Sequence, residues 1–256
     1  MKRPLASLQS LPLYAAGLGL TPSCAFVAGS AALLGDRTGK IWWPASQFWA
    51  RGLTDAAGVT DFIVQGVEVL YDGAPYVLMA NHESHLDPPS FIRASDRPIG
   101  FLTKKELERI PVFGWALRRT GHVFIDRKNR DQSHASIARA AEAVREGRCI
   151  LVFPEGTRGQ ADDLLPFKKG GFVLALEARV SIVPCGIAGT RQILPAHSKF
   201  VNQRGPVALV FGDPIPTHGH THQGKGRLMD EVRTTILALR EQARALVAER
   251  MAAPSR

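Results

Sequence analysis

The sequence contains few cysteines, and their placement argues against a fold held together by disulfides. Only three of its 256 residues are cysteines, Cys24, Cys149 and Cys185, and they are widely spaced. An odd number without paired spacing offers neither a disulfide framework nor a paired-cysteine zinc site, so we expect a reducing compartment. Cys149 and Cys185 each lie in an apolar run, which predicts that both pack in the core.

Acidic residues are scarce relative to basic ones. The 23 Asp and Glu are outnumbered by 32 Lys and Arg, which gives a formal net charge of +9. Such an excess predicts a polyanionic partner, either nucleic acid, an anionic membrane or a phosphorylated substrate. The basic residues are spread along the chain without a recognition helix or an RNA-binding signature, so we expect no nucleic-acid partner. A membrane surface is the favoured polyanion.

Charged residues are absent altogether from residues 4–35. An uncharged run of that length is long enough for a membrane-spanning helix. Pro12 and Pro22 interrupt the run, however, and a proline inside a helix kinks or breaks it, which predicts short apolar helices instead. Basic residues lie on both sides of the run, so the distribution of positive charge predicts no orientation across a membrane.

Three tryptophans, Trp42, Trp43 and Trp49, follow this run. Tryptophan favours the headgroup level of a bilayer, where the ring has apolar surroundings while its N–H stays hydrated. We therefore interpret residues 1–55 as a membrane-associating helical hairpin, partly inserted into one leaflet. Three alternatives remain open: a single spanning helix, a cleaved signal peptide, and a soluble helix pair that covers the core.

Beyond residue 55 the apolar runs become short and rich in β-branched residues. They predict seven strands, at residues 62–70, 76–80, 99–103, 122–125, 149–153, 181–187 and 207–211. Helical patterns are found at residues 133–146, 172–178 and 228–249. Strands that alternate with helices predict an α/β fold over residues 56–256, with a mixed, largely parallel sheet flanked by helices. In such sheets ligands bind at loops beyond the strand ends.

The first candidate site follows the strand expected at 76–80, in the segment Asn-His-Glu-Ser-His-Leu-Asp at residues 81–87. His82 is a candidate general base, and Asp87 is close enough to hold its other ring nitrogen. Pro88 and Pro89 prevent a helix from running through the pair, so a turn is expected. A base oriented in this way can take a proton from a hydroxyl, whose oxygen then attacks a carbonyl.

Other interpretations of this segment are weaker. His82 could be a structural histidine in a loop. His82, His85 and Asp87 could bind a metal ion, yet the spacing and the proline break differ from the zinc-protease helix, so we expect no metal. Ser84 lacks the glycine-flanked elbow of a covalent nucleophile, and we expect Asn81 and Ser84 to shape the turn.

A second candidate site follows the strand expected at 149–153, in Phe-Pro-Glu-Gly-Thr-Arg at residues 153–158. Gly156 allows the backbone to approach a ligand closely, and Glu155, Thr157 and Arg158 add a carboxylate, a hydroxyl and a guanidinium. A guanidinium can bind a phosphate through two parallel hydrogen bonds. Together the two segments predict acyl transfer onto a phosphorylated alcohol.

In this order the segments resemble the motifs of the glycerolipid acyltransferases that make phosphatidic acid, the 1-acylglycerol-3-phosphate acyltransferases. The first family motif, Asn-His-x-Ser-x-x-Asp, is matched by residues 81–87. The other segments that resemble family motifs lie at residues 104–107, 110–114, 121–127, 153–158 and 182–184, so the similarity covers about residues 60–215. The sequence departs from the pattern at Gly159, where a serine is common, and at the additional His85.

The resemblance implies a role for each candidate residue. His82 and Asp87 would form the catalytic pair, and the residues that would hold the phosphate of the acceptor are Lys104, Arg127, Glu155, Gly156, Thr157 and Arg158. Lys104 is favoured over Lys105, although either side chain could point inward. For Arg127 the alternative is a surface ion pair with a nearby aspartate.

The resemblance also implies the reaction and its partners. The free sn-2 hydroxyl of lysophosphatidate would attack the thioester of acyl-CoA or acyl-acyl carrier protein, as a step of phospholipid biosynthesis, with no further cofactor. The protein would work on a membrane surface, at the cytoplasmic face of the cell membrane. Alternatives are another acceptor (glycerol 3-phosphate, another lysophospholipid or a lyso-aminolipid) and a non-catalytic module that binds phosphate on a membrane or on RNA.

Overall fold

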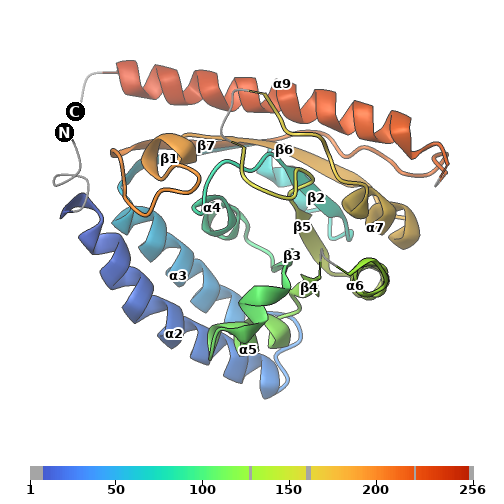
Figure 1. The fold of residues 1–256 in the computed structure, drawn as a ribbon, viewed down its shortest axis with the longest axis horizontal. Coiled ribbons are helices and arrows are strands. Elements are labelled where there is room, and N and C mark those ends of the chain that lie inside the picture. The colour runs from blue at the N-terminus through green and yellow to red at the C-terminus, as the bar shows by residue number, and fades with distance from the viewer. Residues whose placement is uncertain (1–7, 127–128, 160–162, 222, 254–256) are drawn as a thin grey trace.

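A seven-stranded sheet forms the centre of the computed structural model, which describes residues 8–126, 129–159, 163–221 and 223–253 (Figure 1). The strand order is β1-β7-β6-β2-β5-β3-β4. The strands are β1 (Val59–Gln65), β2 (Val77–Ala80), β3 (Ile99–Lys104), β4 (Val123–Ile125), β5 (Cys149–Val152), β6 (Ile182–Ala188) and β7 (Gly205–Phe211). Neighbouring strands are parallel except β6 and β7, which are antiparallel. The predicted mixed, largely parallel sheet is confirmed.

Helices cover both faces of this sheet. On one side lie α2 (Leu11–Leu33), α3 (Trp42–Ala56), α4 (Asp87–Ala94) and α5 (Phe113–Arg119), and on the other α6 (Arg130–Arg145), α7 (Gly170–Ala178) and α9 (Lys225–Ala252). Three short segments complete the described elements: η1 (Val67–Leu70), η2 (Lys105–Arg109) and α8 (Thr190–Ile193). Figure 1 shows α9 and the α2–α3 pair on opposite sides of the sheet.

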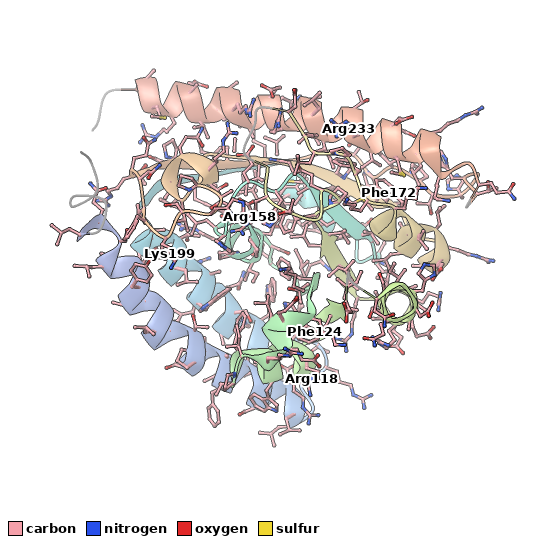
Figure 2. All side chains as sticks on the ribbon, in the orientation of Figure 1. Arg118, Phe124, Arg158, Phe172, Lys199 and Arg233 are labelled. Atoms are coloured by element: carbon pink, nitrogen blue, oxygen red, sulfur yellow. The ribbon has the colours of Figure 1, made fainter. Side chains whose placement is uncertain are left out.

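Side chains that alternate in direction along the buried strands form two hydrophobic cores, one on each face of the sheet. In β2, Val77 and Met79 pack with residues of α6, α7 and α9, whereas Leu78 and Ala80 pack with residues of α2, α3 and α4. Successive side chains of a strand point to opposite faces, so a fully apolar strand requires cover on both sides. Figure 2 shows side chains filling both layers, with Phe172, fully buried on α7, labelled in one of them. The buried Cys149 and Cys185 confirm the prediction that they pack in the core.

The N-terminal apolar run forms one continuous helix, so the predicted break at Pro22 is wrong. Helix α2 extends over 23 residues with Pro22 inside it. A proline in a helix interior costs about 3 kcal/mol, but α2 packs along α3 and against α5. Beside the proline, Trp49 Nε1 donates a hydrogen bond of 3.0 Å to Thr21 Oγ1. Tertiary packing therefore outweighs the local preference, and the hairpin is formed by one long and one shorter helix.

Two of the three clustered tryptophans lie in the protein core, so their interpretation as headgroup anchors is wrong. Trp42 and Trp43 are only 5% and 3% exposed. Their indole N–H groups donate to the carbonyl oxygens of Asp36 and Ser95, each at 3.1 Å. Their rings attach α3 to the body of the protein, whereas Trp49 is half-buried between α3 and α2.

The first strand is shorter than predicted, because Gly66 ends it. β1 stops at Gln65, and the rest of the predicted strand forms the turn η1. Gly66 adopts a φ of 71°, which is unfavourable for other residues, and a Cβ atom there would lie 2.4 Å from the carbonyl oxygen of Phe211. The backbone turn at this point therefore requires glycine.

Two helix starts also differ from the sequence expectations. α6 begins three residues before Ser133, because the side chain of Asn129 caps it by accepting a 3.1 Å hydrogen bond from Gln132 N. The prolines after Asp87 were expected to interrupt any helix, and they instead occupy the first turn of α4. Proline is tolerated there, since the first N–H groups of a helix have no intrahelical partner.

Gly186 in β6 provides a test of the packing between the sheet and α9. A Cβ atom on Gly186 would lie 2.2 Å from the backbone of α9, whereas a Cβ on Gly205 in β7 would meet nothing within 4 Å. We expect Gly186→Ala to lower the free energy of unfolding by about 1–3 kcal/mol, because the helix must move away from the strand. Gly205→Ala is the control, and denaturant unfolding is the measurement. Equal stability of both variants would contradict this packing.

Candidate active site

The turn that carries His82 is attached to the sheet by Asn81. Asn81 follows the buried strand β2, and its side chain pairs with the backbone of Ile187 in β6. Nδ2 donates to the carbonyl oxygen at 2.9 Å, and Oδ1 accepts from the N–H at 2.8 Å. The side chain thus continues the hydrogen bonding between the two strands beyond the end of β2. As expected, Asn81 shapes the turn.

Asp87 is the centre of the turn and is fully buried. Its Oδ2 accepts hydrogen bonds from His82 Nδ1 (2.7 Å) and from the backbone N–H groups of Glu83 (2.7 Å) and Ser84 (2.9 Å). Its Oδ1 accepts from Thr190 Oγ1 at 2.6 Å. Four donors compensate for the burial of a carboxylate, which would otherwise be strongly unfavourable. The structure thus brings together the two residues that the sequence paired.

The contact with Asp87 determines how His82 faces the cavity beside it. Because Nδ1 donates to the carboxylate, Nε2 is the ring nitrogen left to accept a proton. The ring stacks on Phe153, with 4.0 Å between centroids and 14° between planes. His82 also lines the cavity, and 17% of its side chain is exposed. An oriented imidazole at a cavity wall is the arrangement that a general base requires.

Glu155 joins the second motif to the first. It is buried, and its Oε1 accepts from the backbone N–H of His82 at 2.8 Å, while Oε2 accepts from that of Leu165 at 2.9 Å. Burial raises the pKa of Glu155, and the two N–H groups oppose this rise. Gly159 N donates to the carbonyl oxygen of His82 at 2.8 Å. Glu155 therefore helps to position His82, and its predicted contact with a headgroup stays a prediction.

Gly156, Thr157 and Arg158 all line the cavity. Gly156 adopts a φ of 72° in the turn after β5. Thr157 is exposed and Arg158 is half-buried. Burial lowers the pKa of Arg158, and the charge of nearby Asp87 opposes this. Among the described residues, no hydrogen-bond partner reaches the buried Nη1 of Arg158. A buried donor without an acceptor is unfavourable, so this atom indicates a place for an anionic ligand.

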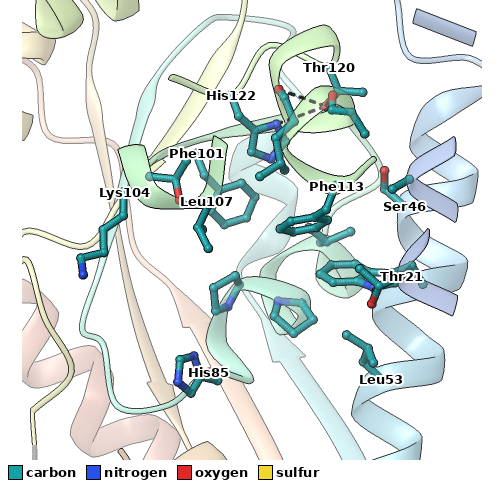
Figure 3. Close-up of a pocket in the computed structure, with 18 of the residues that line it drawn as sticks. Thr21, Ser46, Leu53, His85, Phe101, Lys104, Leu107, Phe113, Thr120 and His122 are labelled. Carbon is teal, nitrogen blue, oxygen red and sulfur yellow. Dashed lines mark hydrogen bonds between the residues drawn. The ribbon is translucent and has the colours of Figure 1, made fainter. Parts of the chain in front are cut away.

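The two adjacent lysines point to different surroundings. Lys104, at the end of β3, lines the cavity, whereas Lys105 donates to Gln132 Oε1 at 2.7 Å and lies 3.4 Å from Asp126 Oδ2. Figure 3 shows Lys104 and His85 on one side of the pocket and the N-terminal helices on the other. Lys104 is thus the lysine available to a ligand. The candidate residue Arg127 lies outside the described residues.

The cavity itself has a volume of about 450 Å³, and apolar side chains form most of its wall. Its walls come from α2, α3, α4, α5 and β3, with apolar side chains that include Ala28, Trp49, Leu53, Ile92, Phe101 and Phe113. The contribution of the two N-terminal helices was not predicted. No local pattern marks these residues, because they meet the site only through the packing of α2 and α3.

His122 lies on the wall opposite His85 in Figure 3. Its ring stacks on Phe101 with 5.3 Å between centroids, and Nδ1 lies 3.2 Å from Thr120 Oγ1. Burial lowers the pKa of His122 to about 4. At neutral pH the imidazole is therefore uncharged, which suits an apolar cavity.

A second carboxyl group lies in the same turn as His82 and was given no role from the sequence. Glu83 is buried, its Oε1 accepts from Asn81 Nδ2 at 3.3 Å, and Nη2 of Arg244 in α9 lies 4.0 Å away. Burial and the neighbouring Asp87 raise the pKa of Glu83 to about 7. Its burial depends on α9, so the local sequence does not distinguish it from an exposed glutamate.

The described part of the chain contains no arrangement of side chains suited to a metal ion. No group of three or more His, Cys, Asp or Glu there is arranged to hold a metal ion. The sequence offered His82, His85 and Asp87 as possible metal ligands. The carboxylate of Asp87 already accepts the four hydrogen bonds described above, and His85 is exposed. The expectation that the chemistry needs no metal stays a prediction.

Several known acyltransferases are similar to this chain in sequence. The 1-acyl-sn-glycerol-3-phosphate acyltransferase of Saccharomyces cerevisiae is 34% identical over 167 residues, covering 64% of this chain and 54% of that protein. The enzyme of that name from Borreliella burgdorferi is 36% identical over 160 residues, covering 62% and 60%. An uncharacterized acyltransferase of Schizosaccharomyces pombe is 35% identical over 178 residues, covering 68% and 63%. The matches thus cover less than two thirds of these relatives.

A solved structure is similar over the whole chain. The crystal structure of the 1-acyl-sn-glycerophosphate (LPA) acyltransferase PlsC from Thermotoga maritima covers 100% of both chains with a TM-score of 0.76 and 23% identity, which supports the fold. The sequence model of the acyltransferase family matches residues 61–188, half of the 256 residues, including both candidate motifs. The family resemblance inferred from the motifs is confirmed. This chain belongs to the acyltransferase family.

Proposed function

We propose that this protein transfers a fatty acyl group from an acyl thioester to the free sn-2 hydroxyl of lysophosphatidate, which yields phosphatidate. The observation that carries the proposal is the 2.7 Å contact between His82 Nδ1 and buried Asp87, at the wall of a cavity that Arg158 also lines. The names of several relatives support the acceptor. The thioester would come from acyl-CoA or acyl carrier protein.

In the proposed mechanism His82 acts as the general base. Nε2 takes the proton of the acceptor hydroxyl as its oxygen forms a bond to the thioester carbonyl carbon. The carbon–sulfur bond then breaks, and the leaving thiolate takes the proton back from the imidazolium. Asp87 keeps the ring in place and stabilises its positive form without itself being protonated. No acyl-enzyme forms, and no resident cofactor takes part.

The other predicted residues would bind the two substrates. Arg158 and Lys104 would hold the phosphate of the acceptor, since the buried Nη1 of Arg158 lacks an acceptor among the described residues. Gly156 and Thr157 would contribute close backbone approach and a hydroxyl. The apolar part of the cavity would receive an acyl chain, because its volume of about 450 Å³ is in the range of small-ligand pockets.

Helix α2 would hold the protein on the membrane. Among the described residues, α2 is the helix whose length and composition would allow it to cross a bilayer. However, Thr21 hydrogen-bonds to α3, and the hydroxyl of Tyr14 donates to the carbonyl of Lys199, so α2 is attached to the protein body along its length. Its outward face exposes large apolar side chains, with Leu18 80% and Phe26 62% exposed. We infer insertion into one leaflet, at the cytoplasmic face of the cell membrane.

The role of His82 is tested with His82→Ala. General-base catalysis contributes about 10²- to 10⁴-fold to a rate, and we expect a loss of that size while the protein stays folded. The measurement is thiol release from acyl-CoA with lysophosphatidate, alongside glycerol 3-phosphate and lysophosphatidylethanolamine as competing acceptors. His134→Ala, on the exposed side of α6, is the matched control. Turnover of folded His82→Ala at the wild-type rate would refute the mechanism.

The role of Arg158 is tested with Arg158→Ala. Loss of a charge-assisted hydrogen bond to phosphate should raise the KM for lysophosphatidate by about 10- to 100-fold, with a smaller effect on kcat. Monoacylglycerol, which lacks the phosphate, should be used equally by the variant and the wild type. Arg145→Ala, exposed on α6, controls for the loss of charge. An unchanged KM for lysophosphatidate would remove Arg158 from the phosphate site.

Membrane attachment is tested with Leu18→Asp combined with Phe26→Asp. Removal of residues 1–55 would open the core, because Trp42 and Trp43 are buried in it. We expect the double variant to bind vesicles of anionic phospholipid about tenfold more weakly, since two apolar side chains are replaced by charges. Leu237→Asp, at an exposed position of α9, is the control in the same flotation assay. Unchanged flotation of the double variant would exclude α2 as the attachment surface.

A further inference from the structure

We propose that Thr190 is a positioning residue for the His82–Asp87 pair. Its Oγ1 donates a 2.6 Å hydrogen bond to Asp87 Oδ1, the oxygen that does not contact His82. Thr190 is fully buried and lies 103 positions after Asp87 in the sequence. The inference rests on the proposed function, and it assigns to the segment after β6 a part in catalysis.

The backbone around Thr190 is built to place this hydroxyl. β6 ends at Ala188, and Gly189 turns the chain with a φ of 96°. A Cβ atom on Gly189 would lie 2.2 Å from the carbonyl oxygen of Pro206, so the turn requires glycine. Thr190 then opens the short helix α8 directly beneath the turn that carries His82.

A second contact joins α8 to the same turn. Ser84 Oγ donates to the carbonyl oxygen of Leu194 at 2.6 Å, and Asn202 N donates to that of Ile193 at 2.8 Å. The α8 segment is therefore held between the His82 turn and the following loop. Movement of Thr190 relative to Asp87 is restricted from both sides.

The hydroxyl of Thr190 completes the orientation of the Asp87 carboxylate. Three donors fix Oδ2, and Thr190 binds Oδ1, so the carboxylate plane cannot rotate without breaking a hydrogen bond. The plane of the carboxylate in turn sets the direction in which His82 Nε2 points. A displacement of about 1 Å in a reacting group can reduce a rate by about 10²-fold. Thr190 thus acts through Asp87 and His82 and does not touch the substrates.

The test compares Thr190→Val, which removes the hydroxyl at nearly constant volume, with Thr190→Ser, which keeps it. With the full chain and the thiol-release assay, we expect kcat of Thr190→Val to fall about 10- to 100-fold while both KM values change little. Thr190→Ser should keep most of kcat. Thr217→Val is the matched control, because Thr217 is buried and donates to the carbonyl of Val180 at the opposite end of β6.

Each outcome is decisive. A wild-type kcat for folded Thr190→Val, or an equal loss in Thr190→Ser, would overturn the inference while leaving the proposed function intact. Wild-type protein that releases thiol from neither acyl-CoA nor acyl-acyl carrier protein would overturn both. If Thr190→Val does not fold, Thr190→Cys replaces it, because a thiol is a weaker donor of similar size. A kcat for Thr190→Cys clearly below that of Thr190→Ser supports the role, and a kcat equal to that of the wild type overturns it.

Discussion

The buried carboxylate of Asp87 is the constraint on which the candidate site depends. It lies at the start of α4 and receives four hydrogen bonds, from the His82 ring, from two backbone N–H groups of the preceding turn and from the Thr190 hydroxyl. A carboxylate can be buried only where such donors are supplied. The turn therefore has one favourable conformation, and in that conformation His82 lies at the cavity wall with one nitrogen occupied.

The surrounding fold supports this turn from several directions. Glu155 holds the backbone of His82, Asn81 attaches the turn to β6, and Arg158 comes from the loop after the neighbouring strand β5. The N-terminal helices α2 and α3 provide the apolar wall opposite. In the proposed function α2 meets the bilayer, so a lipid acceptor would reach His82 from the membrane-facing side of the protein. The polar residues of the candidate site and the apolar residues of α2 and α3 therefore line the same cavity.

Much of the fold and the core of the site could be predicted from the sequence, and the failures have a common cause. The pairing of His82 with Asp87 is local, so the spacing of the two residues in the sequence was sufficient to predict it. The contacts of Glu155 and Thr190 join residues 73 and 103 positions apart, and no local pattern encodes them. The predicted break at Pro22 was wrong because helix packing outweighed a local preference. Contacts within one short segment could be predicted, whereas contacts between residues far apart in the sequence could not.

The tautomer of His82 tests the central interaction most directly. If Asp87 holds Nδ1–H, then ¹⁵N NMR of histidine-labelled protein, at a pH where the ring is neutral, should show Nδ1 protonated and Nε2 with a free lone pair. His82→Ala identifies the signal by its loss. We expect this tautomer in the wild type and its loss or weakening in Asp87→Ala. A dominant Nε2–H tautomer in the wild type would contradict it, because His82 could then not accept a proton toward the cavity.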